Sequence, residues 1–111
     1  MAFSPPEEGG FLRNGYPPKI LRQLRRGDWR VEDELDLHGL NRMQAARALG
    51  DFLDEAKAGG LQCVRIVHGK GTGVLRAALR AALPARSEVL GFVEAPAAQG
   101  GSGAVLVLLK A

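Results

Sequence analysis

The sequence is poor in the residues that most often carry chemistry or cross-links. Its 111 residues include one cysteine and two histidines, and only 5% of them are aromatic. A single cysteine excludes an internal disulfide, and one cysteine with two histidines is too few for a Cys/His zinc site, which needs about four ligands. Because Cys63 lies in the apolar run of residues 61–67, we expect a buried and unreactive thiol.

Long hydrophobic runs are also missing. No stretch approaches the roughly 20 apolar residues that span a bilayer, and the first six residues lack the charged start and apolar core of a signal peptide. The length is that of one domain, and 46% hydrophobic with 24% charged residues is enough to bury a core. We therefore expect a monomer with a cytoplasmic location and no membrane partner.

Acidic charge is scarce in one segment near the N-terminus. The net charge is +3 and the pI is near 9.5, a mild basic bias that is compatible with a nucleic-acid partner. Between residues 13 and 30 the only acidic residue is Asp28, whereas the basic residues are Arg13, Lys19, Arg22, Arg25, Arg26 and Arg30. The run is either a solvated helix face or a nucleic-acid contact. Arg22, Arg25 and Arg26 are the candidate contacts.

Hydrophobic periodicity predicts the order strand, helix, strand, helix, strand, strand for the compact part of the chain. Before this part we expect an irregular arm of residues 1–17 and a short helix of residues 18–26 that stops at Gly27. The compact part then consists of a strand from residue 34, a helix at 42–58, a strand at 62–67, a helix at 73–83, a strand at 88–94, a mobile loop at 95–103 and a strand at 104–109. Thr72 is expected to cap the helix at 73–83, with Val74 on its buried side and Pro84 after its end.

These elements predict an α/β fold, an α+β sandwich in the order βαβαββ. Strand-helix-strand crossovers are almost always parallel, and a short loop between the last two strands favours an antiparallel hairpin. We expect a four-stranded mixed sheet that carries two helices. Residues 1–33 would form a basic arm with little core of its own, and residues 34–111 the domain.

Two His-Gly dipeptides each close a strand-like run. The first ends residues 35–39 (LDLHG), the second ends residues 64–69 (VRIVHG), and a helical pattern follows each. Ligands bind at the edge where the carboxyl ends of parallel strands meet. We therefore expect His38 and His68 to converge within reach of one phosphate, with Asp36 orienting His38. The plainer alternatives are a solvent-facing strand side and a helix-capping His38.

The second His-Gly opens a glycine-rich loop, HGKGTG. Gly69, Gly71 and Gly73 would let backbone amides approach an anion, and Lys70 and the next helix start would add positive charge. The spacing is neither that of a P-loop nor that of a dinucleotide fingerprint. The alternative is a tight turn whose glycines serve geometry alone. Gly71→Val is expected to impair anion binding, because a β-branched residue resists a positive φ and blocks the approach of the backbone.

With LDLHG, HGKGTG and the later GGSGA of residues 100–104 in order, the chain resembles the Small MutS-Related (Smr) domain over about residues 34–110. The segment LRRG of residues 24–27 resembles the basic helix that precedes the domain in stand-alone bacterial members. The resemblance implies a fold similar to the C-terminal domain of translation initiation factor three. It also implies nucleic-acid binding and, in several relatives, endonuclease activity on DNA or on RNA, including messages on ribosomes.

The residues implicated by the resemblance are Asp36, His38, His68, Gly69 and Lys70. In the first hypothesis the chain is an endonuclease: one imidazole is the general base, the other the general acid, and the loop from Gly69 through Thr72 to Gly73 holds the phosphate.

In the same hypothesis Asp36 orients His38 or holds a divalent Mg²⁺ or Mn²⁺ ion. A metal-independent route on RNA would use the 2′-hydroxyl as nucleophile.

The second hypothesis is a non-catalytic module that binds nucleic acid or a ribosome through the same loop and the basic segment. In that case removal of residues 1–30 should weaken binding and leave the fold intact. A third reading is a small-molecule phosphate binder.

Overall fold

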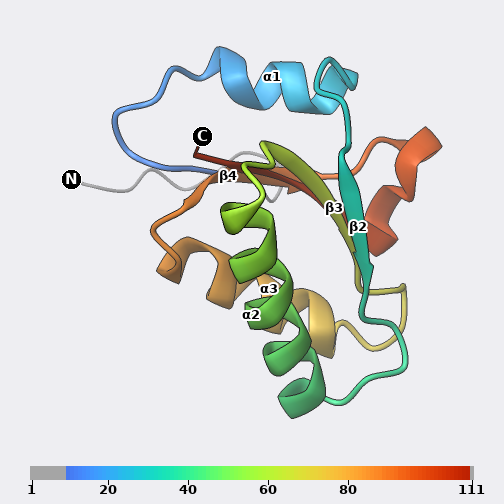
Figure 1. Cartoon of the computed structure of the whole chain (residues 1–111). Coiled ribbons are helices and arrows are strands. Elements are labelled where there is room, and N and C mark those ends of the chain that lie inside the picture. Colours follow the sequence, from blue (N-terminus) through green and yellow to red (C-terminus); the bar gives the residue numbers. More distant parts are fainter. Residues whose placement is uncertain (1–9, 111) are drawn as a thin grey trace.

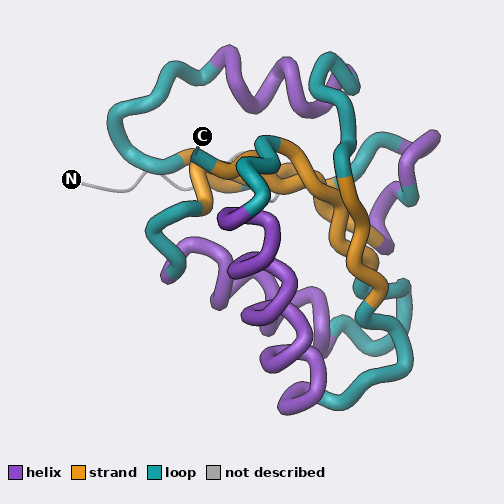
Figure 2. The backbone as a smooth tube through the Cα atoms, viewed as in Figure 1, coloured by secondary structure: helices purple, strands orange, loops and turns teal. Residues whose placement is uncertain are grey.

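The structure is a computed structural model that describes residues 10–110, and these residues build one mixed sheet with helices on both faces (Figures 1 and 2). The elements in chain order are β1 (Phe11–Leu12), α1 (Lys19–Arg26), β2 (Asp33–Asp36), α2 (Arg42–Ala58), β3 (Cys63–Val67), α3 (Val74–Ala85), β4 (Val89–Glu94) and β5 (Ala104–Leu109). Two 3₁₀ segments, Ala97–Gln99 and Gly101–Gly103, lie between β4 and β5. No helix among the described residues is long and apolar enough to cross a membrane.

The sheet has five strands in the order β1-β4-β5-β3-β2. β2 and β3 are parallel, with Asp36 opposite Val67, and the other neighbours are antiparallel. The α/β class, the parallel pair and the final hairpin are as predicted from the sequence. The prediction of four strands is wrong, because the two residues of β1 pair with β4.

The helices divide into two layers. In Figure 1, α2 and α3 lie below the sheet and α1 lies above it. The core between the sheet and the helices α2 and α3 includes Leu49, Leu53 and Leu83. On the opposite face of the sheet, Leu24 of α1 packs in a second cluster with the half-buried Trp29. Each face is therefore covered, which explains why β5 is buried at every position.

The expected irregular arm is wrong at β1, whereas residues 13–17 contain no helix or strand. Phe11 is buried in the core and its ring stacks on that of Phe92, with centroids 5.6 Å apart. Residues 1–9 of the arm lie outside the described residues. Leu24 is fully buried, so α1 also belongs to the packed fold, as its apolar side predicted. The division of the chain at residue 33 stays a prediction.

Local details of α3 and of the loop after β4 differ from the sequence prediction. Pro84 lies inside the last turn of α3, where its missing N–H removes a single helical bond close to the helix end. Val74, the first residue of α3, is exposed rather than buried. The loop expected to be mobile forms two 3₁₀ turns, in which the Gln99 amide donates to the Pro96 carbonyl at 2.8 Å. Cys63 is fully buried as expected, and burial raises the pKa of its thiol to about 11.

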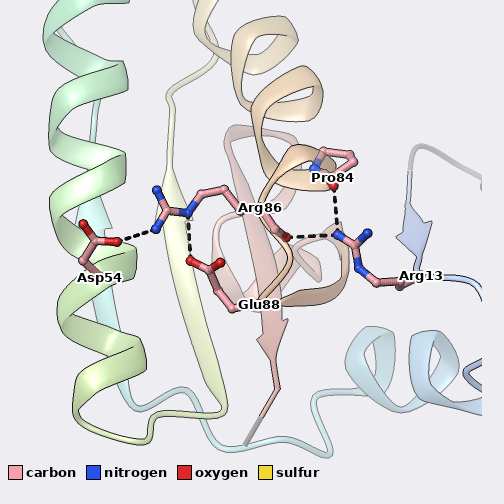
Figure 3. A network of polar contacts seen from close by, with 5 residues as sticks. All are labelled: Arg13, Asp54, Pro84, Arg86 and Glu88. Carbon is pink, nitrogen blue, oxygen red and sulfur yellow. Dashed lines mark hydrogen bonds and ion pairs between the residues drawn. The ribbon is translucent and has the colours of Figure 1, made fainter.

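Two arginines join the elements at the end of α3 (Figure 3). Arg86 contacts Asp54 of α2, and its Nε donates to Glu88 at 2.8 Å. Arg13 donates to the carbonyl oxygens of Pro84 and Val89, each at 2.8 Å, and to that of Arg86 at 3.0 Å. Arg13 is thus used in the fold and is not a free member of the basic segment.

Arg13→Ala is expected to lower the free energy of unfolding by about 1–3 kcal/mol, because three hydrogen bonds to carbonyl groups are lost. Urea denaturation measures the change. Arg22→Ala, at an exposed position of α1, is the control and should change stability by less than about 0.5 kcal/mol. Equal effects of the two substitutions would contradict the structural role of Arg13.

Candidate nucleic-acid interface and active site

The loops after β2 and β3 meet at one edge of the sheet, at the lower right of Figure 1. The Leu37 amide continues the parallel ladder by donating to the Val67 carbonyl at 2.7 Å. A Cβ atom placed on Gly69 would lie 3.3 Å from the Cβ of His38, so the two His-Gly dipeptides are in contact. Together they line a cleft of about 540 Å³ made by residues 38–42 and 68–76. The predicted convergence of the two strand ends is therefore present in the structure.

Asp36 holds the ring of His38. One carboxylate oxygen, Oδ1, accepts from His38 Nδ1 at 2.6 Å and from the His38 backbone amide at 3.0 Å. These two bonds hold the pKa of the Asp36 carboxyl below its usual value. Because the ionised carboxylate only accepts, Nδ1 carries a proton, and Nε2 is the ring nitrogen that is left for a ligand. The His38 side chain is 69% exposed, so its ring stands open to solvent at the cleft.

His68 is placed differently from His38. The residue is only 5% exposed, and its Nδ1 donates to the Gly69 carbonyl at 2.7 Å. Its Nε2 is buried and has no hydrogen-bond partner among residues 10–110. Burial is the main reason that the pKa of this imidazole lies below its usual value, with Glu94 favouring and Arg76 and Arg80 opposing the proton. In this conformation Nδ1 is engaged by the Gly69 carbonyl and Nε2 is shielded from solvent, although the residue lies in the lining of the cleft.

The glycine-rich loop offers amides to a ligand, but Gly69 does not. The amides of His68 and Gly69 both donate to the Gly103 carbonyl, at 2.9 and 3.0 Å, so the expected contact from the Gly69 amide to a phosphate is not available. Among the described residues, the amides from Lys70 to Gly73 donate to no protein acceptor. They precede α3, whose N-terminus adds partial positive charge.

The capping of α3 also differs from the prediction. The N-cap is Gly73, not Thr72, and the Thr72 hydroxyl accepts from the Val74 amide at a long 3.4 Å. Gly73 has a φ of 90° and Gly69 a φ of 84°, whereas Gly71 is not among the positive-φ glycines. The positive φ expected at Gly71 is therefore wrong, because the left-handed glycines lie two residues to either side, at Gly69 and Gly73. The blocked approach of the backbone stays a prediction.

A matched pair of substitutions tests this loop geometry. Gly73→Ala is expected to cost about 1–2 kcal/mol of strain at the loop and to weaken binding of an oligonucleotide. Gly71→Ala should leave the loop unstrained and weaken binding less than Gly73→Ala does, because its φ is not positive and a Cβ there meets no protein atom within 4 Å. Affinity measured by fluorescence anisotropy checks both. Equal losses from the two variants would contradict the assignment.

Sequence reasoning did not select two basic residues that line the cleft. Arg42 begins α2 and Arg76 lies in the first turn of α3, and both line the cleft beside the exposed Lys70. Arg76 lies 3.6 Å from Glu94. Gly103 supports the loop, because a Cβ there would lie 3.2 Å from the Lys70 side chain. A basic residue within the first turn after each motif was the available signal for the two arginines.

The basic residues of α1 do not join this cleft. α1 lies at the top of Figure 1, beyond the sheet from α2 and α3, and contributes nothing to the cleft lining. Arg26 pairs with Asp28 at 2.6 Å, Arg25 is half-buried, and Arg22 is exposed. A nucleic-acid role of Arg22, Arg25 and Arg26 therefore stays a prediction about a separate surface.

The cleft offers few ligands for a divalent ion. Among residues 10–110 no group of three or more His, Cys, Asp or Glu side chains is placed to hold a metal, and Oδ1 of Asp36 already accepts two hydrogen bonds. These residues do not fit a dedicated metal site made by protein alone. An ion shared between Asp36 and a substrate phosphate, as Mg²⁺ often is, stays a prediction.

Comparison with known proteins identifies the family to which the chain belongs. The family model of the Smr domain matches residues 35–110. The chain belongs to the Smr domain family. Two solved structures share the fold of this Smr domain. The Smr domain of Thermus thermophilus MutS2 has a TM-score of 0.69 and 43% identity over 71% of this chain and 99% of that one. YdaL, a stand-alone small MutS-related protein from Escherichia coli, has a TM-score of 0.82 and 29% identity over 92% and 82%.

Curated relatives include longer proteins. Ribosome rescue factor SmrB of Serratia proteamaculans is 38% identical over 106 residues, which are 94% of this chain and 60% of that protein. Endonuclease MutS2 of Thermus thermophilus is 44% identical over 105 residues, which are 95% of this chain and 14% of that protein. This Smr domain thus spans only part of the length of either relative.

Proposed function

We propose that this Smr domain binds nucleic acid in the cleft between the β2–α2 and β3–α3 loops and cuts a phosphodiester bond there. The observation that carries the proposal is the Asp36–His38 pair, in which a carboxylate 2.6 Å from Nδ1 orients an exposed imidazole. Lys70 and the open amides that follow it line the same cleft. The names of the relatives, an endonuclease and a ribosome rescue factor, support a nucleic-acid substrate and a ribosome as a partner.

The proposed chemistry places the proton transfer on His38. Its Nε2 takes a proton from the nucleophile, which is water on DNA and the 2′-hydroxyl on RNA. The oxygen then attacks phosphorus, the bond to the leaving oxygen breaks, and that oxygen takes a proton from solvent. Lys70 and the loop amides stabilise the negative charge that develops on the phosphate. On RNA the nucleophile belongs to the substrate, so these residues suffice without a metal.

His68 has a supporting role in this proposal rather than an acid–base one. Its buried ring fixes the start of the loop through the 2.7 Å bond to the Gly69 carbonyl, and burial, together with Arg76 and Arg80, lowers the pKa of the imidazole and so disfavours its protonated form. An acid–base role for His68 would require the loop to move and to expose Nε2.

Binding in the cleft is tested by the salt dependence of affinity. Lys70→Ala is expected to weaken oligonucleotide binding about three- to tenfold and to reduce the slope of log K against log salt by roughly 0.7–0.9, the value for one lost phosphate contact. Lys57→Ala removes the same charge in the last turn of α2, at the end away from the cleft, and should change neither quantity. Equal losses in the two variants would place binding elsewhere.

The non-catalytic alternative uses the same cleft. It predicts the same dependence on Lys70, with no cleaved product in Mg²⁺, Mn²⁺ or EDTA. Measuring both binding and cleavage with wild type and Lys70→Ala therefore separates the two hypotheses.

A further inference from the structure

Two large apolar side chains are exposed to solvent in the first turns of the two helices that begin at the cleft. Among residues 10–110 the exposed large hydrophobic residues are Met43, 78% exposed, and Val74, 48% exposed. Met43 is the second residue of α2 and Val74 is the first of α3. Val74 lines the cleft, and so does Arg42, the neighbour of Met43. Both apolar side chains thus belong to the first turns of the two helices that leave the cleft.

The fold does not require apolar residues at these two positions. The buried face of α2 includes Ala45, Leu49 and Leu53, and Met43 precedes it by two residues, which places it on another side of the helix. On α3 the buried residues are Leu79 and Leu83, and Val74 lies outside that stripe. A single exposed apolar residue is ordinary on a protein surface. Here Val74 lines the cleft and Met43 directly follows Arg42, which also lines it, and the rest of the described surface has no other exposed large hydrophobic residue.

We infer that Met43 and Val74 contact an unpaired base of the strand whose phosphate lies in the cleft, an inference that rests on the proposed function. The cleft, which Val74 lines and beside which α2 begins, carries Lys70, Arg42 and Arg76, which match the charge of a phosphate. A nucleotide joins a charged phosphate to a flat apolar base, so a site in which basic side chains lie near exposed apolar ones matches both parts. In a duplex the base faces are stacked inside, whereas an unpaired base offers its face to protein side chains.

The test crosses protein variants with a change in the ligand. The proteins are wild type, Met43→Gln/Val74→Thr, and the conservative Met43→Leu/Val74→Ile. The ligands are a single-stranded oligonucleotide and one of the same length in which abasic sites replace the bases, so that the charge is unchanged. The substituted side chains are exposed, so circular dichroism and thermal unfolding should match those of wild type.

The polar double variant is expected to bind the intact oligonucleotide about five- to twentyfold more weakly than wild type, as apolar contact area is lost. It should bind the abasic oligonucleotide as wild type does, with an unchanged salt slope. The conservative variant should keep wild-type affinity for both ligands.

Three outcomes would overturn the inference. One is an equal loss of affinity for the intact and the abasic ligand. Another is a polar variant that binds the intact strand as tightly as wild type, which would indicate that Met43 and Val74 contact a protein partner instead of a base. In both, Lys70-dependent binding still stands and the proposed function survives. The third, no binding of either ligand by wild type, removes the proposed function itself.

Discussion

Replacement of His38 by alanine is expected to slow phosphodiester cleavage by about 10²- to 10⁴-fold, the usual contribution of a positioned acid–base group. Affinity for the nucleic acid should change little, because Lys70 and the loop amides remain. The His38 side chain is 69% exposed, so its removal leaves no cavity in the core. Single-turnover cleavage with protein in excess measures the chemical step apart from binding.

A carboxylate substitution separates orientation from the imidazole itself. Asp36→Asn removes the charged acceptor that fixes the ring of His38 and should slow cleavage at least tenfold. Asp33→Asn makes the same change at an exposed position in the same strand, β2, and should leave the rate within about twofold of wild type. If both variants cleave equally fast, the Asp36–His38 pair is not the active group.

Replacement of Leu24 by alanine is expected to lower the free energy of unfolding by about 2–5 kcal/mol, the cost of a cavity at a buried leucine. Leu24 is fully buried over the α1 face of the sheet, with Val93 and Leu106 in the same cluster. Urea denaturation measures the loss, and Arg26→Ala on the exposed side of the same helix should cost less than about 1 kcal/mol.

The Leu24 result also bears on truncation of the chain. Removal of residues 1–30 was expected from the sequence to leave the fold intact. The structure indicates that this deletion uncovers an apolar face of the sheet and breaks the pairing of β1 with β4. A Leu24→Ala protein as stable as Arg26→Ala would restore the view of α1 as a separable arm.

The elements with strong local signals could be predicted from the sequence. The bounds of α2 follow from apolar residues at helical spacing, and Asn41 forms a capping box with Gln44 at 2.8 Å. The parallel pairing of β2 and β3 follows from the crossover rule. β1 could not be predicted, because a strand of two residues has no periodicity and its partner, β4, lies some 80 residues away along the chain.

The candidate site, too, could be predicted from the sequence only in part. The meeting of the two His-Gly dipeptides follows from the parallel strands that they end. The burial of the His68 ring and the loss of the Gly69 amide to Gly103 could not be predicted, because Gly103 comes from a loop that follows 34 residues later. No local pattern indicates which of two similar dipeptides turns its ring inward.

The measurement that tests the central claim most directly is cleavage of supercoiled plasmid and single-stranded RNA by wild type and His38→Ala, side by side, in Mg²⁺, Mn²⁺ and EDTA. We expect wild type to cut, and the variant to bind equally well and leave the substrate intact; cutting in EDTA would confirm that the residues act without a metal. Equal cutting by both proteins, or binding by wild type with no product under any condition, would contradict cleavage at the Asp36–His38 pair.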